Sequence, residues 1–193
     1  MSKTKFIKNF IKSPGTIGAV MPSSKYLADL ITSDIGLERA TVIVELGPGT
    51  GVFSSVIVKK KMEEAVFFAI ELNRELYDTF RHKYPYIKIY NNSAANLQNL
   101  MKKEGVETID AIVCGLPWAS FPPGLQDELL DAIVEALSPG GWFTTFAYLQ
   151  GMMLPAGQRF RTRLKDHFSV VKTTRVEWKN FPPAFTYRCS KGE

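Results

Sequence analysis

The most informative segment of this 193-residue sequence is Val44-Glu45-Leu46-Gly47-Pro48-Gly49-Thr50-Gly51. It ends an apolar run that begins at Thr41 and predicts a buried strand, and it leads into a helical pattern that extends to about Lys60. Glycines between a strand and a helix let the backbone turn tightly and let a ligand approach where a Cβ atom would collide. The segment therefore predicts a ligand-binding loop.

Two acidic residues indicate which ligand suits this loop. The spacing is G-x-G-x-G, whereas a dinucleotide-binding loop has G-x-G-x-x-G to seat a pyrophosphate. Glu45 lies two residues before Gly47, where a carboxylate favours a cationic group over a phosphate. Glu71 ends the second predicted strand, 20 residues after Gly51, and a carboxylate there can accept hydrogen bonds from both hydroxyls of a ribose. The pattern favours a positively charged nucleoside ligand.

Beyond the loop, strand and helix patterns alternate along the chain. Such alternation predicts an α/β fold with a doubly wound, Rossmann-like sheet that is mostly parallel. The tail departs from this rhythm, because two strand patterns joined by a short link predict an antiparallel C-terminal hairpin and a total of seven strands. The expected strands are residues 41–46, 65–70, 86–90, 109–114, 142–148, 168–178 and 184–189, and the expected helices are 25–33, 52–60, 74–84, 94–103 and 125–137.

Composition limits the class of protein. The chain is 45% hydrophobic and 12% aromatic, which excludes a disordered chain, and its apolar runs are too short to cross a membrane. Cys114 and Cys189 form no disulfide framework and fit no metal-ligand spacing. Pro14 interrupts the N-terminal apolar segment, so we expect no secretory signal and a cytoplasmic protein. We expect one domain over residues 1–193, with N-terminal helices in 1–36 and a catalytic core in 37–193.

The loop and the second acid together carry a family resemblance. Residues 45–51 and Ile70-Glu71 resemble the class I methyltransferases that use S-adenosylmethionine, in which the loop holds the methionyl part and the acid binds the ribose. That family usually has another acid near the adenine, and here Asn92 and Ser93 are the candidates for that contact. The cofactor-binding residues that this resemblance implies are Glu45, Gly47, Pro48, Gly49, Thr50, Gly51, Glu71, Leu72, Asn92, Ser93 and Gly115.

The segment after the fourth predicted strand concerns the methyl acceptor. Gly115-Leu116-Pro117-Trp118 resembles the Asn/Asp-Pro-Pro-Tyr motif of amino-methylating family members, in which a carbonyl and a polar side chain orient the amine. Trp118 would offer a ring face to developing positive charge. Gly115 replaces the polar residue, and the alternative interpretation is a rigid turn with a buried Trp. Tyr148 and Tyr26 are further candidates to orient the amine, whereas neither His82 nor His167 is placed as a convincing base.

A narrower resemblance extends over nearly the whole chain. Residues 18–24, 140–143 and 180–184 resemble bacterial phospholipid N-methyltransferases that act on phosphatidylethanolamine. The sequence is also similar to rRNA adenine dimethyltransferases, which implies RNA adenine N6-methylation as the alternative. The chain ends soon after the predicted hairpin, without their C-terminal helical domain, and this argues against RNA. Methylation of a small soluble amine and a cofactor-binding protein without catalysis also stay open, as does the oligomeric state.

The net charge of +5 is unevenly distributed. Residues 1–28 carry five lysines and no acid, and residues 158–193 carry nine basic and three acidic residues. Residues 3–12 predict a helix with an apolar face of Phe6, Ile7, Phe10 and Ile11 among lysines. We expect it to lie on an anionic membrane surface, on the inner face, or to cover the cofactor as a lid. Arg159, Arg161, Arg163 and Lys165 form a second basic cluster that suits lipid or RNA phosphates, or simply solvent.

Overall fold

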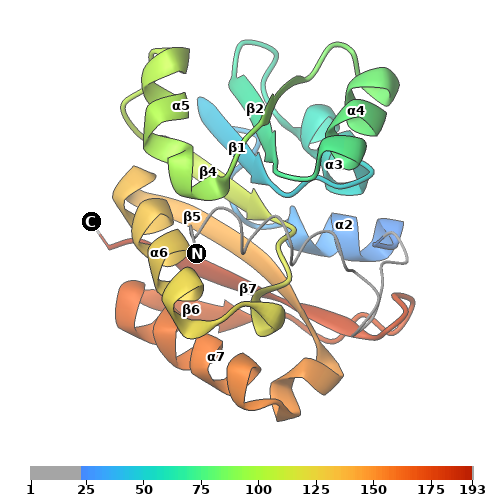
Figure 1. The fold of residues 1–193 in the computed structure, drawn as a ribbon, viewed down its shortest axis with the longest axis vertical. Coiled ribbons are helices and arrows are strands. Elements are labelled where there is room, and N and C mark those ends of the chain that lie inside the picture. Colours follow the sequence, from blue (N-terminus) through green and yellow to red (C-terminus); the bar gives the residue numbers. More distant parts are fainter. Residues whose placement is uncertain (1–22, 193) are drawn as a thin grey trace.

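The computed structural model describes residues 23–192. A seven-stranded sheet crosses the molecule in the order β3-β2-β1-β4-β5-β7-β6, with helices on both faces (Figure 1). The sequence therefore predicted the fold class correctly. The predicted helix at residues 3–12 and the segment before Ser23 lie outside the described residues.

The first five strands pair in parallel, and the last strand pairs antiparallel with its neighbours on both sides, the fifth and the sixth. Chain order explains the layout, because the chain first builds outward from β1 to β3 and then returns to place β4 on the other side of β1. Ligands bind at such a reversal point in open α/β sheets, beyond the carboxyl ends of the strands. The strands are β1 (Val42–Leu46), β2 (Val66–Glu71), β3 (Lys88–Asn91), β4 (Ile109–Cys114), β5 (Leu137–Tyr148), β6 (Val170–Thr173) and β7 (Ala184–Ser190).

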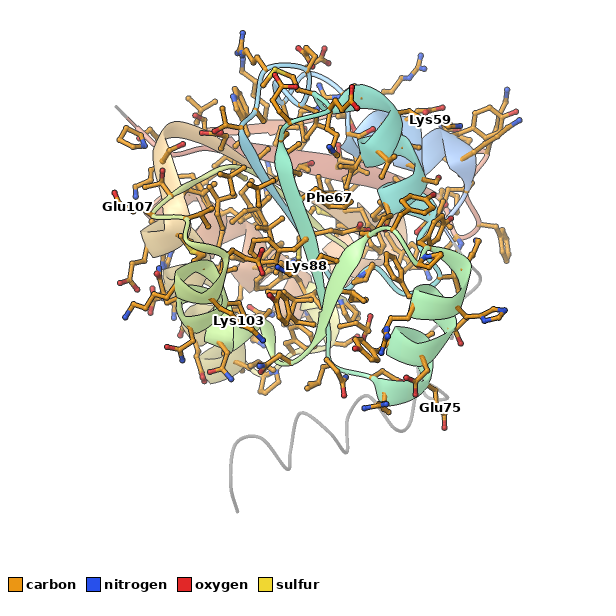
Figure 2. All side chains as sticks on the ribbon, turned by 90° about the horizontal axis from the view of Figure 1, so that it is seen from above. Lys59, Phe67, Glu75, Lys88, Lys103 and Glu107 are labelled. Carbon is orange, nitrogen blue, oxygen red and sulfur yellow. The ribbon has the colours of Figure 1, made fainter. Side chains whose placement is uncertain are left out.

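The helices cover both faces of the sheet. Figures 1 and 2 show α2 (Lys25–Ile31), α3 (Val52–Lys60) and α4 (Arg74–Lys83) on one face. The other face carries α5 (Leu97–Glu104), α6 (Pro123–Ala136) and α7 (Pro155–His167). Side-chain caps begin α2 and α4. Ser24 accepts a hydrogen bond from the Leu27 N–H, and Asn73 accepts from the N–H groups of Glu75 and Leu76. The short 3₁₀ helices are η2 (Ala94–Asn96), η3 (Trp118–Ser120) and η4 (Leu149–Met153).

Apolar side chains fill both layers between sheet and helices. Ile43, Val44 and Leu46 are fully buried, because β1 lies in the middle of the sheet with helices above and below. The larger core lies beneath α5, α6 and α7, and a second core lies beneath α2 and α3. Both layers meet at β1 and β4, so the two central strands form a rigid base for the loops at their carboxyl ends.

Some predicted boundaries were wrong. The strand expected over 168–178 is only the four-residue β6, because the Thr174 hydroxyl accepts the Thr186 N–H and takes the place of a backbone ladder partner. The helix expected from Ala94 begins as the 3₁₀ turn η2, which the Ser93 side chain caps. β5 starts at Leu137, with an irregularity in its pairing to β4 between Ile109 and Ala111. Within residues 23–192, no helix is long and apolar enough to cross a membrane.

Candidate active site

The carboxyl ends of the parallel strands bring the predicted site residues to one edge of the sheet. The glycine loop follows β1, Glu71 ends β2, the turn that starts at Gly115 follows β4, and Tyr148 ends β5. β1 pairs with both β2 and β4, so the glycine loop lies between Glu71 and that turn. The topology therefore brings together residues that are up to about a hundred positions apart in the sequence.

Gly49 lies at the most open point of the loop. Its φ is +54°, a backbone angle that residues with a side chain rarely adopt. A Cβ atom there would meet no other atom within 4 Å. At Gly51, by contrast, a Cβ would lie 2.2 Å from the Tyr84 ring. Gly51 thus permits packing against α4, whereas Gly49 leaves free space beside its backbone, as a ligand requires.

Glu71 holds this loop in place. One carboxylate oxygen accepts the Gly49 N–H at 3.2 Å and the other accepts the Asn73 N–H at 2.8 Å. The residue is 6% exposed, and burial raises its pKa above the ordinary value. A carboxylate has about four lone-pair sites, so these two hydrogen bonds leave capacity for ligand hydroxyls.

Glu45 is fully buried with an incomplete set of hydrogen bonds. Its Oε2 accepts the Ser54 hydroxyl proton, while Oε1 is buried with no partner. Burial raises the pKa of Glu45 to about 8. An unpartnered buried carboxylate oxygen is costly unless a donor completes it. The ammonium group of S-adenosylmethionine is such a donor. The residues present therefore fit this cofactor, because Glu45 can accept from its ammonium group, Gly49 leaves space beside the loop, and Glu71 has acceptor capacity for its hydroxyls.

Gly115 packs backbone to backbone against the glycine loop. Its N–H donates to the Leu46 carbonyl at 2.7 Å, and a Cβ at this position would lie 2.5 Å from the Gly47 carbonyl oxygen. The polar side chain of the related motif cannot fit here without moving the loop. The structure thus gives a physical reason for the glycine, and it leaves backbone groups as the polar groups that this residue presents. Leu116 and Pro117 continue the turn, with the Leu116 side chain against Gly47.

The Trp118 ring does not face the site as an exposed aromatic surface. It is 2% exposed, stacks on Phe160 of α7 with ring centres 4.5 Å apart, and donates its indole N–H to the Thr145 hydroxyl at 3.1 Å. The ring is buried in this structure, and the ring face toward the amine that the resemblance implies stays a prediction. The alternative interpretation, a rigid turn with a buried Trp, describes the structure.

Asn92, Ser93 and Leu72 lie beside Glu71, at the ends of β2 and β3. The Asn92 N–H donates to the Glu71 carbonyl at 3.2 Å, and the Leu72 carbonyl accepts from the Asn91 side chain. The Asn92 side chain accepts from the Ser93 N–H and from Asn96, and the Ser93 hydroxyl caps η2. Their position suits an adenine contact, although both side chains already have local partners.

The two tyrosines differ in their surroundings. Tyr148 is half-buried against the apolar cluster beneath α2, and burial raises its pKa. Tyr26 is 38% exposed, and its ring lies 5.3 Å from the Lys25 ammonium and 4.6 Å from the Lys179 ammonium. Neither histidine joins them, because His167 is bonded to the Arg163 carbonyl and Asp131, and His82 is exposed on α4.

The sequence interpretation missed the side chains that support the site. Ser54 donates to Glu45, and Asn180 is 3% exposed, accepts the Ser24 N–H at 2.8 Å and donates to the Pro182 carbonyl at 2.7 Å. Asn180 thereby ties the start of α2 to the segment before β7. The only sequence signal for this contact was the position of Asn180 in residues 180–184, which the family resemblance had singled out.

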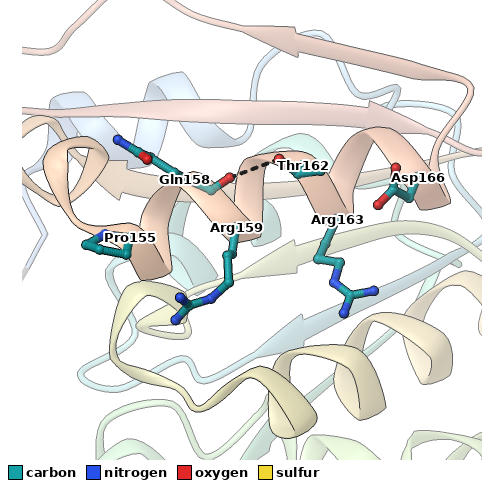
Figure 3. Close-up of a pocket in the computed structure, with 6 residues that line it drawn as sticks. All are labelled: Pro155, Gln158, Arg159, Thr162, Arg163 and Asp166. Atoms are coloured by element: carbon teal, nitrogen blue, oxygen red, sulfur yellow. Dashed lines mark hydrogen bonds between the residues drawn. The ribbon is translucent and has the colours of Figure 1, made fainter.

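Part of the predicted basic cluster lines a surface hollow on α7. Figure 3 shows Arg159 and Arg163 projecting from the same side of this helix, and Arg163 pairs with Asp127 of α6 at 3.1 Å. The hollow is lined by Pro155, Gln158, Arg159, Thr162, Arg163 and Asp166. None of these residues belongs to the glycine loop, so the hollow is separate from the candidate cofactor site.

Comparison with known proteins agrees with this geometry. No protein-family model matches the chain. The chain is 29% identical to a protein named ornithine lipid N-methyltransferase from Singulisphaera acidiphila, over 95% of this chain and 93% of that protein. The O-methyltransferase TomG from Streptomyces achromogenes, solved in complex with S-adenosylmethionine, superimposes with a TM-score of 0.68 at 16% identity, covering 100% of this chain and 91% of that one.

An rRNA methylase from Streptococcus thermophilus shares the fold as well. Its TM-score is 0.61 at 14% identity, with coverage of 87% of this chain and 93% of that one. Structural neighbours with such different acceptors show the fold alone. These similarities show that the chain has the class I methyltransferase fold and is similar to S-adenosylmethionine-dependent methyltransferases, among them a bacterial lipid N-methyltransferase.

Proposed function

We propose that this protein methylates the amine of a phosphatidylethanolamine-type phospholipid at a membrane surface. The observation that carries the proposal is similarity over 95% of the chain to a protein named as a lipid N-methyltransferase. The exposed basic side chains Lys25 and Lys179, which flank Tyr26, support an anionic lipid surface as the partner.

The buried acids would hold the cofactor. Glu45 Oε1 would accept from its ammonium group, Glu71 would accept from the ribose hydroxyls, and the backbone at Gly49 would lie along it. When bound, S-adenosylmethionine supplies a methyl group on a positively charged sulfur, so the protein has to provide position more than acid–base chemistry. Leu72, Asn92, Ser93 and the remaining loop residues Gly47, Pro48, Thr50 and Gly51 would complete the cofactor site.

The turn after β4 would place the amine. The Gly115 carbonyl would accept from the amine, whereas the Leu116 carbonyl already accepts the Trp118 N–H at 3.0 Å and has one lone pair left for it. Pro117 would fix the turn, and Trp118 anchors it to the core through Thr145 and Phe160. Tyr148 would orient the amine from the end of β5, with Tyr26 nearer the surface. Since both histidines lie elsewhere, we propose that solvent takes the proton that the ammonium loses before it attacks.

Transfer from labelled cofactor to vesicles tests the proposal. The protein is incubated with vesicles containing phosphatidylethanolamine, with vesicles of phosphatidylcholine, whose amine is already fully methylated, and with an ornithine-containing lipid. We expect label in the lipid extract of the first vesicles and none with phosphatidylcholine. Label only with the ornithine-containing lipid would keep lipid N-methylation and overturn the phosphatidylethanolamine assignment. Label in neither amine lipid would overturn the proposal.

Residues 1–36 belong to this proposal as a surface segment. We propose that the lysine-rich residues 1–12 bring the catalytic core of residues 37–193 to the inner face of the membrane as a peripheral protein. The alternative acceptors are an RNA adenine and a small amine. Labelled RNA would be recognised after precipitation, and a labelled amine after chromatographic separation from unreacted cofactor.

A further inference from the structure

We infer that apolar side chains beside the candidate active site dock this protein on an anionic lipid bilayer. The inference rests on the proposed function and adds a docking surface within the described residues. We call this surface the apolar rim. Its strongest members are Met153, which is 83% exposed, Phe181, which is 75% exposed, and Trp178, which is 70% exposed; Leu149 and Leu154 complete it.

The rim lies at the edge of the sheet that carries the predicted site. Leu149 and Met153 belong to η4, directly after Tyr148, and Trp178 and Phe181 belong to the connection between β6 and β7. The two segments meet, since the Leu149 N–H donates to the Pro183 carbonyl at 2.9 Å and Tyr148 pairs with Ala184. A lipid whose chains stay in a bilayer beneath the rim would therefore have its headgroup beside the carboxyl end of β5.

Fixed backbone, rather than a loose loop, holds the two aromatic rings outward. Glu177 pairs with Ala184, and the Asn180 N–H donates to the Glu177 carbonyl at 3.4 Å, which closes a turn around Trp178. The buried Asn180 side chain anchors the same turn to Ser24 and to Pro182. Holding large apolar side chains in water brings no gain to folding, so their exposure on an anchored turn points to a partner.

Charge complementarity identifies the partner as an anionic bilayer. Lys25 and Lys179, the residue after Trp178, flank the Tyr26 ring, and Arg175 is exposed on the same connection as Trp178. Glu177 is the one acid between Arg175 and Pro183, and its carboxylate accepts the Lys179 N–H at 2.8 Å. Trp beside basic residues is the composition of membrane interfaces. A second copy of the chain fits less well, because a symmetric contact would bring these cations together.

Vesicle binding of the full chain tests the rim. We compare the wild type, the double variant Trp178→Ala/Phe181→Ala and the matched control Tyr86→Ala, whose side chain is 70% exposed on the segment before β3. On vesicles of phosphatidylcholine with phosphatidylglycerol, we expect the double variant to bind about tenfold more weakly or worse, since two large apolar side chains lose their burial. The control should bind like the wild type.

Tryptophan fluorescence gives a second readout. Of the three tryptophans, Trp118 is buried at 2% exposure and Trp142 is partly buried in β5, whereas Trp178 is 70% exposed. Brominated lipids should therefore quench the wild type mainly through Trp178. The variant Trp178→Phe should lose most of that quenching and keep vesicle binding close to that of the wild type.

Three results would overturn the rim. The first is that the double variant binds vesicles as well as the wild type does. The second is that the wild type dimerises and the double variant does not, with no change in vesicle binding. The third is that the double variant loses activity on a short-chain soluble lipid and still binds vesicles. The labelled lipid product tests the proposed function separately. If vesicle lipids are methylated but the double variant binds vesicles like the wild type, the rim alone is overturned. If the wild type binds vesicles through the rim but yields no labelled lipid, the proposed function alone is overturned.

Discussion

Two buried acids, Glu45 and Glu71, lie near the carboxyl ends of the neighbouring strands β1 and β2, beside the glycine loop. Burial raises the pKa of both, and the charge of Glu71 adds to the effect on Glu45. Glu71 is stabilised by two backbone N–H groups, whereas Glu45 has one hydroxyl donor and an unpartnered oxygen. The two acids therefore have different functions, since one shapes the loop and the other lacks a donor that a cationic ligand would supply.

Replacing Glu71 tests its assignment to the ribose. Glu71→Ala should weaken S-adenosylmethionine binding by about 1.5–3 kcal/mol for each hydrogen bond to the charged group that is lost. Isothermal titration calorimetry measures the change, and circular dichroism confirms that the variant is folded. Unchanged affinity in a folded variant would contradict the assignment.

Replacing Glu45 should separate stability from binding. The folded-state pKa of about 8 lies above the ordinary value of 4.5, so the folded chain retains a proton that the unfolded chain releases between these values. This contribution to stability is complete below about pH 4.5 and is lost as the pH rises toward 8. Thermal denaturation of Glu45→Gln should show a stability advantage over the wild type that grows from pH 5 to pH 8, while cofactor binding weakens. A pH-independent difference would contradict the raised pKa of Glu45 in the protein without its cofactor.

At the scale of the elements, the site depends on how the loops after β1 and β4 fit together. Gly115→Asn restores the side chain of the related motif, but its Cβ would lie 2.5 Å from the Gly47 carbonyl oxygen. We expect a lower melting temperature and weaker cofactor binding. Gly124→Ala is the control, because a Cβ there meets nothing within 4 Å. A fully stable Gly115→Asn variant with increased activity would show that the loops can separate.

The buried Trp118 makes a further prediction at this scale. Thr145→Val leaves the indole N–H and the Cys114 carbonyl without the Thr145 hydroxyl, so the free energy of unfolding should fall by about 1–3 kcal/mol. Urea denaturation measures the loss, and cofactor affinity should stay near that of the wild type. A large loss of activity at unchanged stability would instead favour a direct function for the ring.

The sequence predicted elements better than side-chain orientation. Hydrophobic runs placed β1, β2 and β4 within a residue or two, because central strands buried on both faces have continuous apolar sequences. The predicted length of the edge strand β6 was too great. The strand ends where the Thr174 hydroxyl replaces a backbone partner, and a hydrophobicity pattern does not indicate such a replacement. The sequence left open whether Trp118 is buried, because its inward position depends on Thr145 and Phe160 from distant segments.

Across the whole molecule, charge and apolar exposure favour the same edge of the sheet. The rim residues Trp178 and Phe181 lie there, with Lys25 and Lys179 beside them. The lysine-rich residues 1–12 lie outside the described residues, and their proposed binding to anionic lipid would add to that of this edge. A surface of this kind binds reversibly, because each basic residue contributes only about 1 kcal/mol near an anionic bilayer.

The first twelve residues carry a separate prediction. Changing Lys5, Lys8 and Lys12 to Glu should reduce sedimentation with anionic vesicles, and wild-type binding should weaken with salt, since the Debye length is about 8 Å at physiological ionic strength. Activity on a short-chain soluble lipid should survive. If that activity is lost while vesicle binding is unaffected, residues 1–12 act as a catalytic lid.

The acceptor itself is tested most directly by competition in one tube. Labelled S-adenosylmethionine is incubated with the protein, phosphatidylethanolamine vesicles and rRNA together. The label is counted in the chloroform extract and in the rRNA precipitated from the aqueous phase, free of unreacted cofactor. We predict label in the chloroform phase as N-methylated lipid, with the rRNA unlabelled. Label in the rRNA and none in the lipid would contradict lipid N-methylation and establish RNA as the acceptor.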